Sequence, residues 1–281
     1  MAGRTPQAGG FRAALLQITS SNDMAENIAA VSRMIRDAAS DGADFVLTPE
    51  TTGLMERRTK AVFEKACTEE SDPGLAAFRE LAADLGIWLL IGSLAVKLSA
   101  DKLANRSFLI DDQGGVVARY DKIHMFDVDL PGGESYRESK NYTPGDKAVI
   151  AETPWGPLGM TVCYDLRFPY LYRALAKGGA RMLTVPSAFT KTTGEAHWHL
   201  LMRARAIETG CFVFAPAQCG THADGRETFG HSLVVAPWGE VLADGGKSPG
   251  IVVADVDPAS TDKARAAVPS LTHDKPFDGP E

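Results

Sequence analysis

The sequence predicts one α/β domain, and three observations support this fold class. Short apolar runs alternate with stretches whose apolar residues recur every three or four positions, as strands alternate with helices. The 44% apolar and 23% charged fractions are those of an ordinary folded protein. No linker, repeat or low-complexity block interrupts the alternation in the 281 residues. We therefore expect a single domain over residues 11–258, a flexible N-terminal tail at 1–10 and a polar C-terminal tail at 259–281.

The first half of the domain predicts strands and helices in alternation and then a hairpin. Residues 13–18 form a buried strand, and Ser21 or Asn22 can cap the helix that follows and ends at Gly42. A second helix is expected at 74–85. The later strands of this half are expected at 43–48, 87–94, 106–111 and 116–120. The Asp-Gln-Gly-Gly segment between the last two strands favours a hairpin turn.

The second half repeats the alternation after a long loop. Residues 123–148 contain few periodic apolar positions and many Gly, Pro and charged residues. An ordered loop of this length inside a domain usually has a function. Helices are expected at 169–177 and 196–208. Strands are expected at 158–163, 181–185, 211–216, 232–236, 241–243 and 251–256.

The composition argues against several classes of partner. The 29 Lys+Arg against 36 Asp+Glu give a net charge of −7, which disfavours binding to nucleic acid or to an anionic membrane. The longest apolar run, 85–96, is shorter than the ~18 residues of a transmembrane helix. Four cysteines without CxxC spacing are too few for a disulfide scaffold, and the N-terminus lacks the apolar stretch of a secretory signal. We expect a cytoplasmic protein with reduced thiols.

Three reactive residues follow predicted strands, where sites form in α/β sheets. They are Glu50 in LTPE, Lys122 in YDKIH and Cys163 in TVCYD. Taken alone, they are most simply a surface carboxylate, a solvated cation and a small buried residue. Together they supply a nucleophile, a base to deprotonate it and an ammonium to stabilise an oxyanion. The strand-to-loop position of Cys163 is typical of a nucleophile elbow, in which the backbone N–H of Tyr164 is a second oxyanion donor.

These segments resemble the catalytic segments of the nitrilase (carbon–nitrogen hydrolase) superfamily, in the same chain order. LTPE, YDKIHMFDVDLPG and TVCYDLRFP carry the similarity, which extends over nearly the whole chain. The resemblance implies that Glu50, Lys122 and Cys163 form the catalytic triad of the superfamily. It implies a further catalytic glutamate at Glu138, within RESKNYTPGD. It also implies a four-layer αββα sandwich of two mixed sheets and a homodimer or larger homo-oligomer.

Within the superfamily the chain is most similar to the Nit group, amidases that act on small dicarboxylic monoamides. The segments PSAFTKTTGEAHWHLLMRARAIET, APAQCGTH and FGHSLVVAPWGEV resemble the branch that hydrolyses deaminated glutathione. The resemblance places Arg167, Phe189 and Thr193 in the substrate pocket, with Tyr164. It implies hydrolysis of a small anionic amide to a carboxylate and ammonia through a thioester on Cys163, with no cofactor and no metal.

Other functions are open at this point. The first alternative is the ω-amidase branch, which acts on α-ketoglutaramate and α-ketosuccinamate but usually lacks the Ala-Gln-Cys-Gly segment found at 217–220. Hydrolysis of N-carbamoyl amino acids or of nitriles is a further alternative. A nitrilase-shaped binding or scaffold protein is the non-enzymatic one. That function normally goes with loss of a triad residue, and here all three residues are present.

Several polar and aromatic residues have competing explanations. Arg167 could form a salt bridge with Asp165, although its guanidinium also suits a substrate carboxylate. Phe189 could be a core residue. His197 and His199 are two residues apart on an expected helix, so their side chains point to different sides and do not converge on one metal ion.

Overall fold

Two six-stranded mixed sheets form the centre of the protein, in a computed structural model that describes residues 9–130 and 133–280. In spatial order, the first sheet contains β16 (Gly250–Val256), β1 (Phe11–Gln17), β2 (Phe45–Leu47), β3 (Trp88–Lys97), β4 (Leu103–Ile110) and β5 (Val116–Asp121). The second contains β15 (Val241–Asp244), β14 (Leu233–Val235), β11 (Phe212–Ala215), β10 (Met182–Thr184), β9 (Leu158–Met160) and β8 (Val149–Ala151). In each sheet, three neighbouring strands are parallel and the outer pairs are antiparallel.

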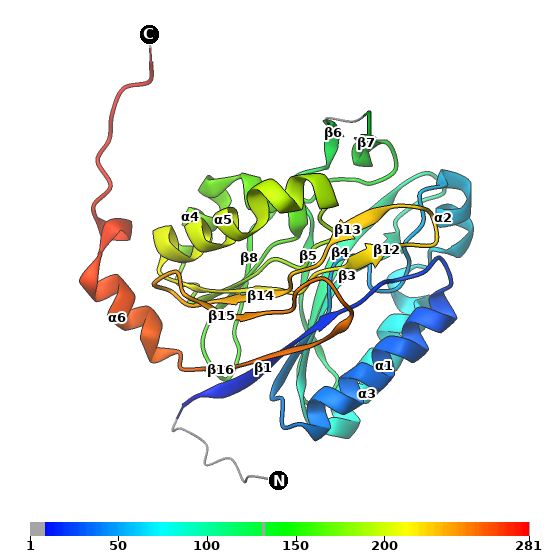
Figure 1. Ribbon diagram of the computed structural model, residues 1–281, viewed down its shortest axis with the longest axis horizontal. Helices are drawn as coiled ribbons and strands as arrows, with labels where there is room; N and C mark the ends of the chain where they lie inside the picture. Colours follow the sequence, from blue (N-terminus) through cyan, green and yellow to red (C-terminus); the bar gives the residue numbers. More distant parts are fainter. Residues whose placement is uncertain (1–8, 131–132, 281) are drawn as a thin grey trace.

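Helices cover the outer face of each sheet (Figure 1). α1 (Met24–Ser40) and α3 (Pro73–Leu85) pack on the first sheet, and α4 (Pro169–Lys177) and α5 (Lys191–Thr209) pack on the second. This order of layers confirms the expected four-layer αββα sandwich. Within the described ranges, no helix is long and apolar enough to cross a membrane.

The largest apolar core joins the two sheets. Phe11 and Phe45 from the first sheet meet Phe214 from the second, and Trp155 stacks on Phe11 with ring centroids 4.4 Å apart. A separate apolar cluster lies between the first sheet and helices α1 and α3. The alternating strand residues therefore fill two cores, one on each face of the first sheet.

Helix α1 begins slightly later than expected. Its N-cap is Asp23, neither Ser21 nor Asn22, and the Asp23 carboxylate accepts hydrogen bonds from the N–H groups of Ala25 and Glu26. A carboxylate at this position both caps the free N–H groups and interacts favourably with the helix dipole.

The expected tail at 259–281 contains a helix, which corrects the prediction for that segment. α6 spans Ala259–Ala267, and its Thr261 and Ala264 side chains are buried. Arg265 donates a hydrogen bond to the carbonyl of Ala180 at 2.6 Å and so attaches the helix to the domain. The expected N-terminal tail lies almost entirely outside the described residues, which begin at residue 9.

The structure also contains short elements that the sequence did not predict. The long loop at 123–148 includes the strands β6 (Asp127–Asp129) and β7 (Ser135–Arg137) and a 3-10 turn at Glu138–Lys140. The other unpredicted elements are α2 (Thr59–Lys65), β8, β12 (Cys219–Thr221) and β13 (Glu227–Phe229).

Candidate active site

Glu50 lies beyond the carboxyl end of β2, after the residues Thr48 and Pro49. Gly92 in the neighbouring strand β3 makes room for this segment, because a Cβ there would lie 2.1 Å from the Thr48 carbonyl oxygen. The Thr48 hydroxyl accepts a hydrogen bond from the Gly92 N–H at 3.0 Å. Gln218 donates a hydrogen bond to the Glu50 carbonyl, also at 3.0 Å. The backbone around Glu50 is therefore held by strand β3 on one side and by Gln218, which lies between β11 and β12, on the other.

Cys163 begins a 3-10 turn at Cys163–Arg167, just beyond β9. Its φ is +47°, a left-handed conformation that is uncommon for residues other than glycine and that fits the expected nucleophile elbow. Asp165 supports the turn by accepting hydrogen bonds from the Val162 N–H at 2.9 Å and from the Tyr120 hydroxyl at 2.6 Å. Because Tyr120 belongs to β5, this carboxylate connects the turn to the other sheet.

Lys122, which directly follows β5, lies between two carboxylates. Its Nζ is 3.0 Å from Glu50 Oε1 and 2.8 Å from Glu138 Oε2, and its side chain is only 2% exposed. Asn105 on β4 donates hydrogen bonds to both carboxylates, at 2.9 and 3.0 Å. The second Glu50 oxygen accepts the N–H of Ala188 at 2.8 Å. Glu50, Lys122 and Glu138 therefore form one buried, hydrogen-bonded charge network.

The network sets the protonation states of the site. Burial raises the pKa of Glu50, whereas the Lys122 charge and a hydrogen bond with the Cys163 thiol lower it. The lowering effects together are the larger, so the pKa of Glu50 lies below its ordinary value. Burial and the Glu50 charge raise the pKa of the Cys163 thiol. Burial lowers the pKa of Lys122, while Glu138 and Glu50 raise it, leaving it well above its ordinary value. The resting site holds a carboxylate, an ammonium and a neutral thiol, which needs a base before it can attack.

The charge network and Cys163 open into a pocket of about 280 Å³. The expected substrate-binding residues that line it are Tyr164, Phe189 and Thr193. The arginines that line it are Arg57, Arg137 and Arg226. The arginines bring positive charge to a pocket in a chain whose net charge is −7, and guanidinium groups suit carboxylate ligands.

Arg167, which the resemblance places in the substrate pocket, is not one of the residues that line it. Its guanidinium lies over the rings of Tyr164 and Phe189, 5.9 and 5.5 Å from their centroids. One of its nitrogens is 3.3 Å from His197 Nδ1. Asp165, the salt-bridge partner in the alternative explanation, accepts hydrogen bonds from the Tyr120 hydroxyl and the Val162 N–H instead. The structure thus places Arg167 against two lining residues.

Sequence reasoning missed several residues of the site, among them Asn105 and Arg226. A buried Asn within the apolar strand β4 was a usable signal, because buried polar groups are normally hydrogen-bonded to something specific. Arg226 lies in the turn between β12 and β13, where charged residues are ordinary. It donates to the Ala188 carbonyl at 2.6 Å and lies 5.3 Å from the Tyr136 ring centroid. Its buried Nε has no hydrogen-bond partner among the described residues.

The arrangement is suited to covalent hydrolysis. It combines a thiol, a carboxylate that can accept the thiol proton, and an ammonium that can stabilise negative charge on oxygen. Within the part of the chain that the structure describes, the one group with the spacing of metal ligands is His199, His231 and Asp244, and these residues do not line the pocket.

Comparison with known proteins assigns the family. The family model for carbon-nitrogen hydrolases matches residues 12–266. The deaminated glutathione amidase of Yersinia enterocolitica is 41% identical over 93% of this chain and 92% of its own length. The C. elegans NitFhit protein matches 95% of this chain with a TM-score of 0.89 and 37% identity; this chain spans 65% of NitFhit. A glutamate-to-glutamine mutant of the amidase from Nesterenkonia sp. AN1 is 28% identical, with a TM-score of 0.78 over 92% of this chain and 98% of its own. Its structure shows the result of Michael addition of acrylamide at the active site cysteine. The chain therefore belongs to the carbon-nitrogen hydrolase family and is an amidase, a hydrolase of carbon–nitrogen bonds.

Proposed function

We propose that this amidase hydrolyses deaminated glutathione, a small anionic amide, to a carboxylate and ammonia through a thioester on Cys163. The observation that carries the proposal is that Glu50, 3.0 Å from Lys122, lines one pocket together with Lys122 and Cys163. The substrate is that of the Yersinia relative, which is similar over almost its whole length. The reaction requires no cofactor, because the three side chains supply base, nucleophile and oxyanion donor.

In the first half-reaction, Glu50 takes the thiol proton of Cys163 as the sulfur attacks the amide carbon. The carbonyl electron pair moves onto oxygen, where Lys122 Nζ and the backbone N–H of Tyr164 stabilise the negative charge. When the tetrahedral intermediate collapses, the C–N bond breaks and Glu50 gives its proton to the departing nitrogen. Ammonia leaves, the acyl group stays on sulfur as a thioester, and Glu50 is again a carboxylate.

In the second half-reaction, Glu50 takes a proton from water as the water oxygen attacks the thioester carbon. Lys122 and Tyr164 stabilise the second oxyanion in the same way. The C–S bond then breaks, and Glu50 returns the proton to the Cys163 sulfur. The sum of both steps is amide plus water giving carboxylic acid plus ammonia, with the enzyme unchanged.

Glu138 is a positioning residue in this scheme. It accepts hydrogen bonds from Lys122 at 2.8 Å, from Asn105 at 3.0 Å and from the N–H of Phe126 at 2.7 Å. These contacts hold the ammonium at the position where the oxyanion forms. Glu138 also supplies the second negative charge that keeps Lys122 protonated.

The charge of the pocket supports an anionic substrate. Arg226 can bind a substrate carboxylate, because its guanidinium lines the pocket and is held there by its hydrogen bond to the Ala188 carbonyl. Phe189 and Thr193 line the pocket beside Tyr164 and contact the rest of the substrate. Arg167 supports binding by holding the rings of Tyr164 and Phe189 in place.

Ammonia release from deaminated glutathione and from α-ketoglutaramate tests the substrate assignment, with an N-carbamoyl amino acid and an aliphatic nitrile as further substrates. We expect the highest kcat/KM for deaminated glutathione. A higher kcat/KM for α-ketoglutaramate would contradict this assignment and would identify the protein as an ω-amidase. Turnover of neither amide would refute the proposed substrate class.

We further propose a homo-oligomer in the cytoplasm. Large apolar side chains are exposed on the outer face of α5, where Leu200 is 70% and Ile207 55% exposed, and Trp238 in the turn before β15 is 58% exposed. A second copy of the chain would cover such residues. The cytoplasmic location suits the chemistry, since a reducing compartment keeps the thiol of Cys163 free to react.

A further inference from the structure

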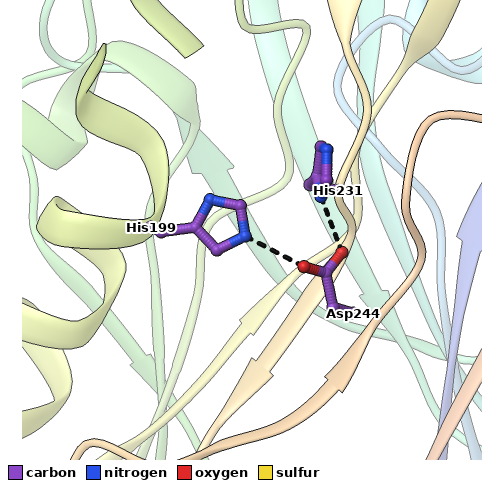
Figure 2. A group of neighbouring side chains, drawn as sticks. All are labelled: His199, His231 and Asp244. Carbon is purple, nitrogen blue, oxygen red and sulfur yellow. Dashed lines mark hydrogen bonds and ion pairs between the residues drawn. The ribbon is translucent and has the colours of Figure 1, made fainter. Parts of the chain in front are cut away.

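We propose that His199, His231 and Asp244 form a binding site for one divalent transition-metal ion, outside the pocket of the amidase reaction. Figure 2 shows both imidazole rings turned toward the carboxylate of Asp244. His199 Nε2 is 2.9 Å from one Asp244 oxygen, and His231 Nδ1 is 2.8 Å from the other. The three ligand atoms lie within 4.8 Å of one another. A tetrahedral zinc ion with bonds of ~2.0–2.1 Å needs roughly 3.4 Å between ligand atoms, so any two of these atoms need to approach by no more than about 1.4 Å.

Each ligand comes from a different segment, and the rest of the fold holds it in place. His199 is on α5, His231 precedes β14 and Asp244 ends β15. The buried Trp198 on α5 donates to the His231 carbonyl at 2.7 Å. The N–H of Gly246 donates to Asp244 at 2.9 Å. Two of the three ligands are therefore positioned by contacts that do not depend on the metal.

Phe229 forms an apolar wall behind both histidines. Its ring stacks on His231 at 4.5 Å and meets the His199 ring edge-on at 6.1 Å. Phe229 also fills the space beside Gly194 of α5, where a Cβ would lie 2.3 Å from its ring. This packing limits the rotation of the imidazoles and leaves their ligand atoms facing the carboxylate, which solvent can reach.

The donor set selects the class of metal. Two imidazole nitrogens and one carboxylate oxygen suit Zn²⁺, Co²⁺ or Ni²⁺, whereas Mg²⁺ and Ca²⁺ prefer oxygen donors alone. Neutral histidines can bind the ion after the N–H proton facing Asp244 moves to the other ring nitrogen. One or more water molecules complete the coordination of three protein ligands. The sequence did not predict this site, because the partners of His199 are not its near neighbour His197 but His231 and Asp244, which lie far along the chain.

A bound ion would fasten α5 to the β14–β15 pair. The N-terminal turn of α5 carries Thr193, which lines the pocket, but the metal ligands take no part in the amidase steps. We therefore expect the ion to raise the melting temperature of the protein rather than to supply chemistry.

Metal titration in the Cys163→Ala background tests the site, because the reactive thiol itself binds Zn²⁺ and Co²⁺. Isothermal titration with Zn²⁺ should show one equivalent bound. Adding His199→Gln or Asp244→Asn should weaken binding by at least about tenfold, since even the loss of a group behind a metal ligand costs about that much. His197→Gln is the matched control on the same helix and should bind as the parent does.

Co²⁺ gives a second readout that reports the ligands directly. The parent should show visible d–d absorption bands on addition of one equivalent, and the bands should be absent in His199→Gln. Zn²⁺ should also raise the melting temperature of the parent but not that of Asp244→Asn. Equal Zn²⁺ affinity in the parent, His199→Gln and Asp244→Asn would overturn the proposal, as would the absence of binding in the parent. Because every variant lacks the nucleophile, these results are independent of the proposed amidase mechanism.

Discussion

Lys122 is held between the carboxylates of Glu50 and Glu138, so its replacement removes both the proposed oxyanion donor and the charge that balances the site. In Lys122→Met, we expect kcat for ammonia release to fall by roughly 10²–10³ because one oxyanion donor is lost. The free energy of unfolding should fall by about 3–5 kcal/mol, because Glu50 and Glu138 would lose their buried partner. Urea unfolding measures the second effect.

The exposed Lys60 offers a matched control for this experiment. It lies 3.8 Å from Glu64 on α2, and its side chain is 90% exposed. Lys60→Met should leave kcat and unfolding unchanged, since exposed ion pairs contribute little. A Lys122→Met variant with wild-type kcat would contradict the role assigned to the ammonium.

The pH dependence of kcat/KM reports the protonation state of Glu50. Its pKa is lowered from an ordinary value of 4.5, so this proposed base is ionised at neutral pH and becomes protonated only in acid. The pKa of Lys122 is raised, so the ammonium persists into alkaline solution. We expect kcat/KM to be flat around neutrality and to fall only below about pH 4.5. An acid limb near pH 6–7 would show that Glu50 is not the ionised base.

The same shift has a consequence for stability. A carboxyl group whose folded-state pKa is lowered stabilises the fold above its unfolded pKa and loses that contribution as the pH falls through the folded value. The Glu50 contribution to the free energy of unfolding is therefore complete at neutral pH and is lost in acid.

At the scale of elements, the position of Glu50 depends on the close approach of β3 to the segment after β2. In Gly92→Ala the added methyl would meet the backbone of Thr48, which cannot move aside as a flexible side chain can. We expect the free energy of unfolding to fall by roughly 1–3 kcal/mol and kcat to fall because the carboxylate is displaced. Thermal unfolding and ammonia release measure the two effects.

Gly250 in β16 is the matched control for Gly92. A Cβ at this strand glycine meets no atom within 4 Å. Gly250→Ala should leave activity at the wild-type level. If Gly92→Ala were equally active, the close contact of β3 with the Thr48 segment would not be what positions the base.

Elements bounded by clear start and stop signals could be predicted from the sequence, and others could not. α4 has the expected bounds because Pro169 begins it and Gly178 follows it. α6 could not be predicted because its sequence is mostly polar and lacks a periodic apolar face, since only Thr261 and Ala264 are buried. α2 was missed because it is short and lacks a side-chain cap at its N-terminus.

Some residues of the site could likewise be predicted from the sequence, and others could not. Glu50, Lys122 and Cys163 could be proposed from the sequence because each follows a predicted strand, and the carboxyl ends of strands share one edge of a sheet. Glu138 required the family resemblance, since nothing in a charged loop marks one glutamate among several. Arg226 could not be found, because its place in the pocket depends on how the β12–β13 turn folds back over the site.

For the whole molecule, the distribution of charge matters more than its sum. The net charge of −7 disfavours nucleic acid as a partner, yet the pocket is lined by Arg57, Arg137 and Arg226. An acidic surface around a basic pocket gives no long-range attraction for an anionic substrate. Under the proposed function, binding of the substrate carboxylate would therefore depend on short-range hydrogen bonds from these arginines.

The assembly of the whole molecule can be tested at the apolar residues of α5. We expect sedimentation velocity to show a homodimer or larger oligomer for the wild type and a smaller species for the Leu200→Asp, Ile207→Asp double variant. Val117, 46% exposed on the edge strand β5, is the control, and Val117→Asp should sediment as the wild type does. A monomeric wild type at micromolar concentration would contradict the proposed oligomer.

Replacement of the thiol tests the central claim most directly. Cys163→Ala removes one sulfur atom, so the fold and the pocket should be kept, as shown by circular dichroism and by calorimetric binding of deaminated glutathione. The account predicts that this variant binds the amide and releases no ammonia above the buffer rate. Ammonia release at or near the wild-type rate from Cys163→Ala would contradict the thioester mechanism.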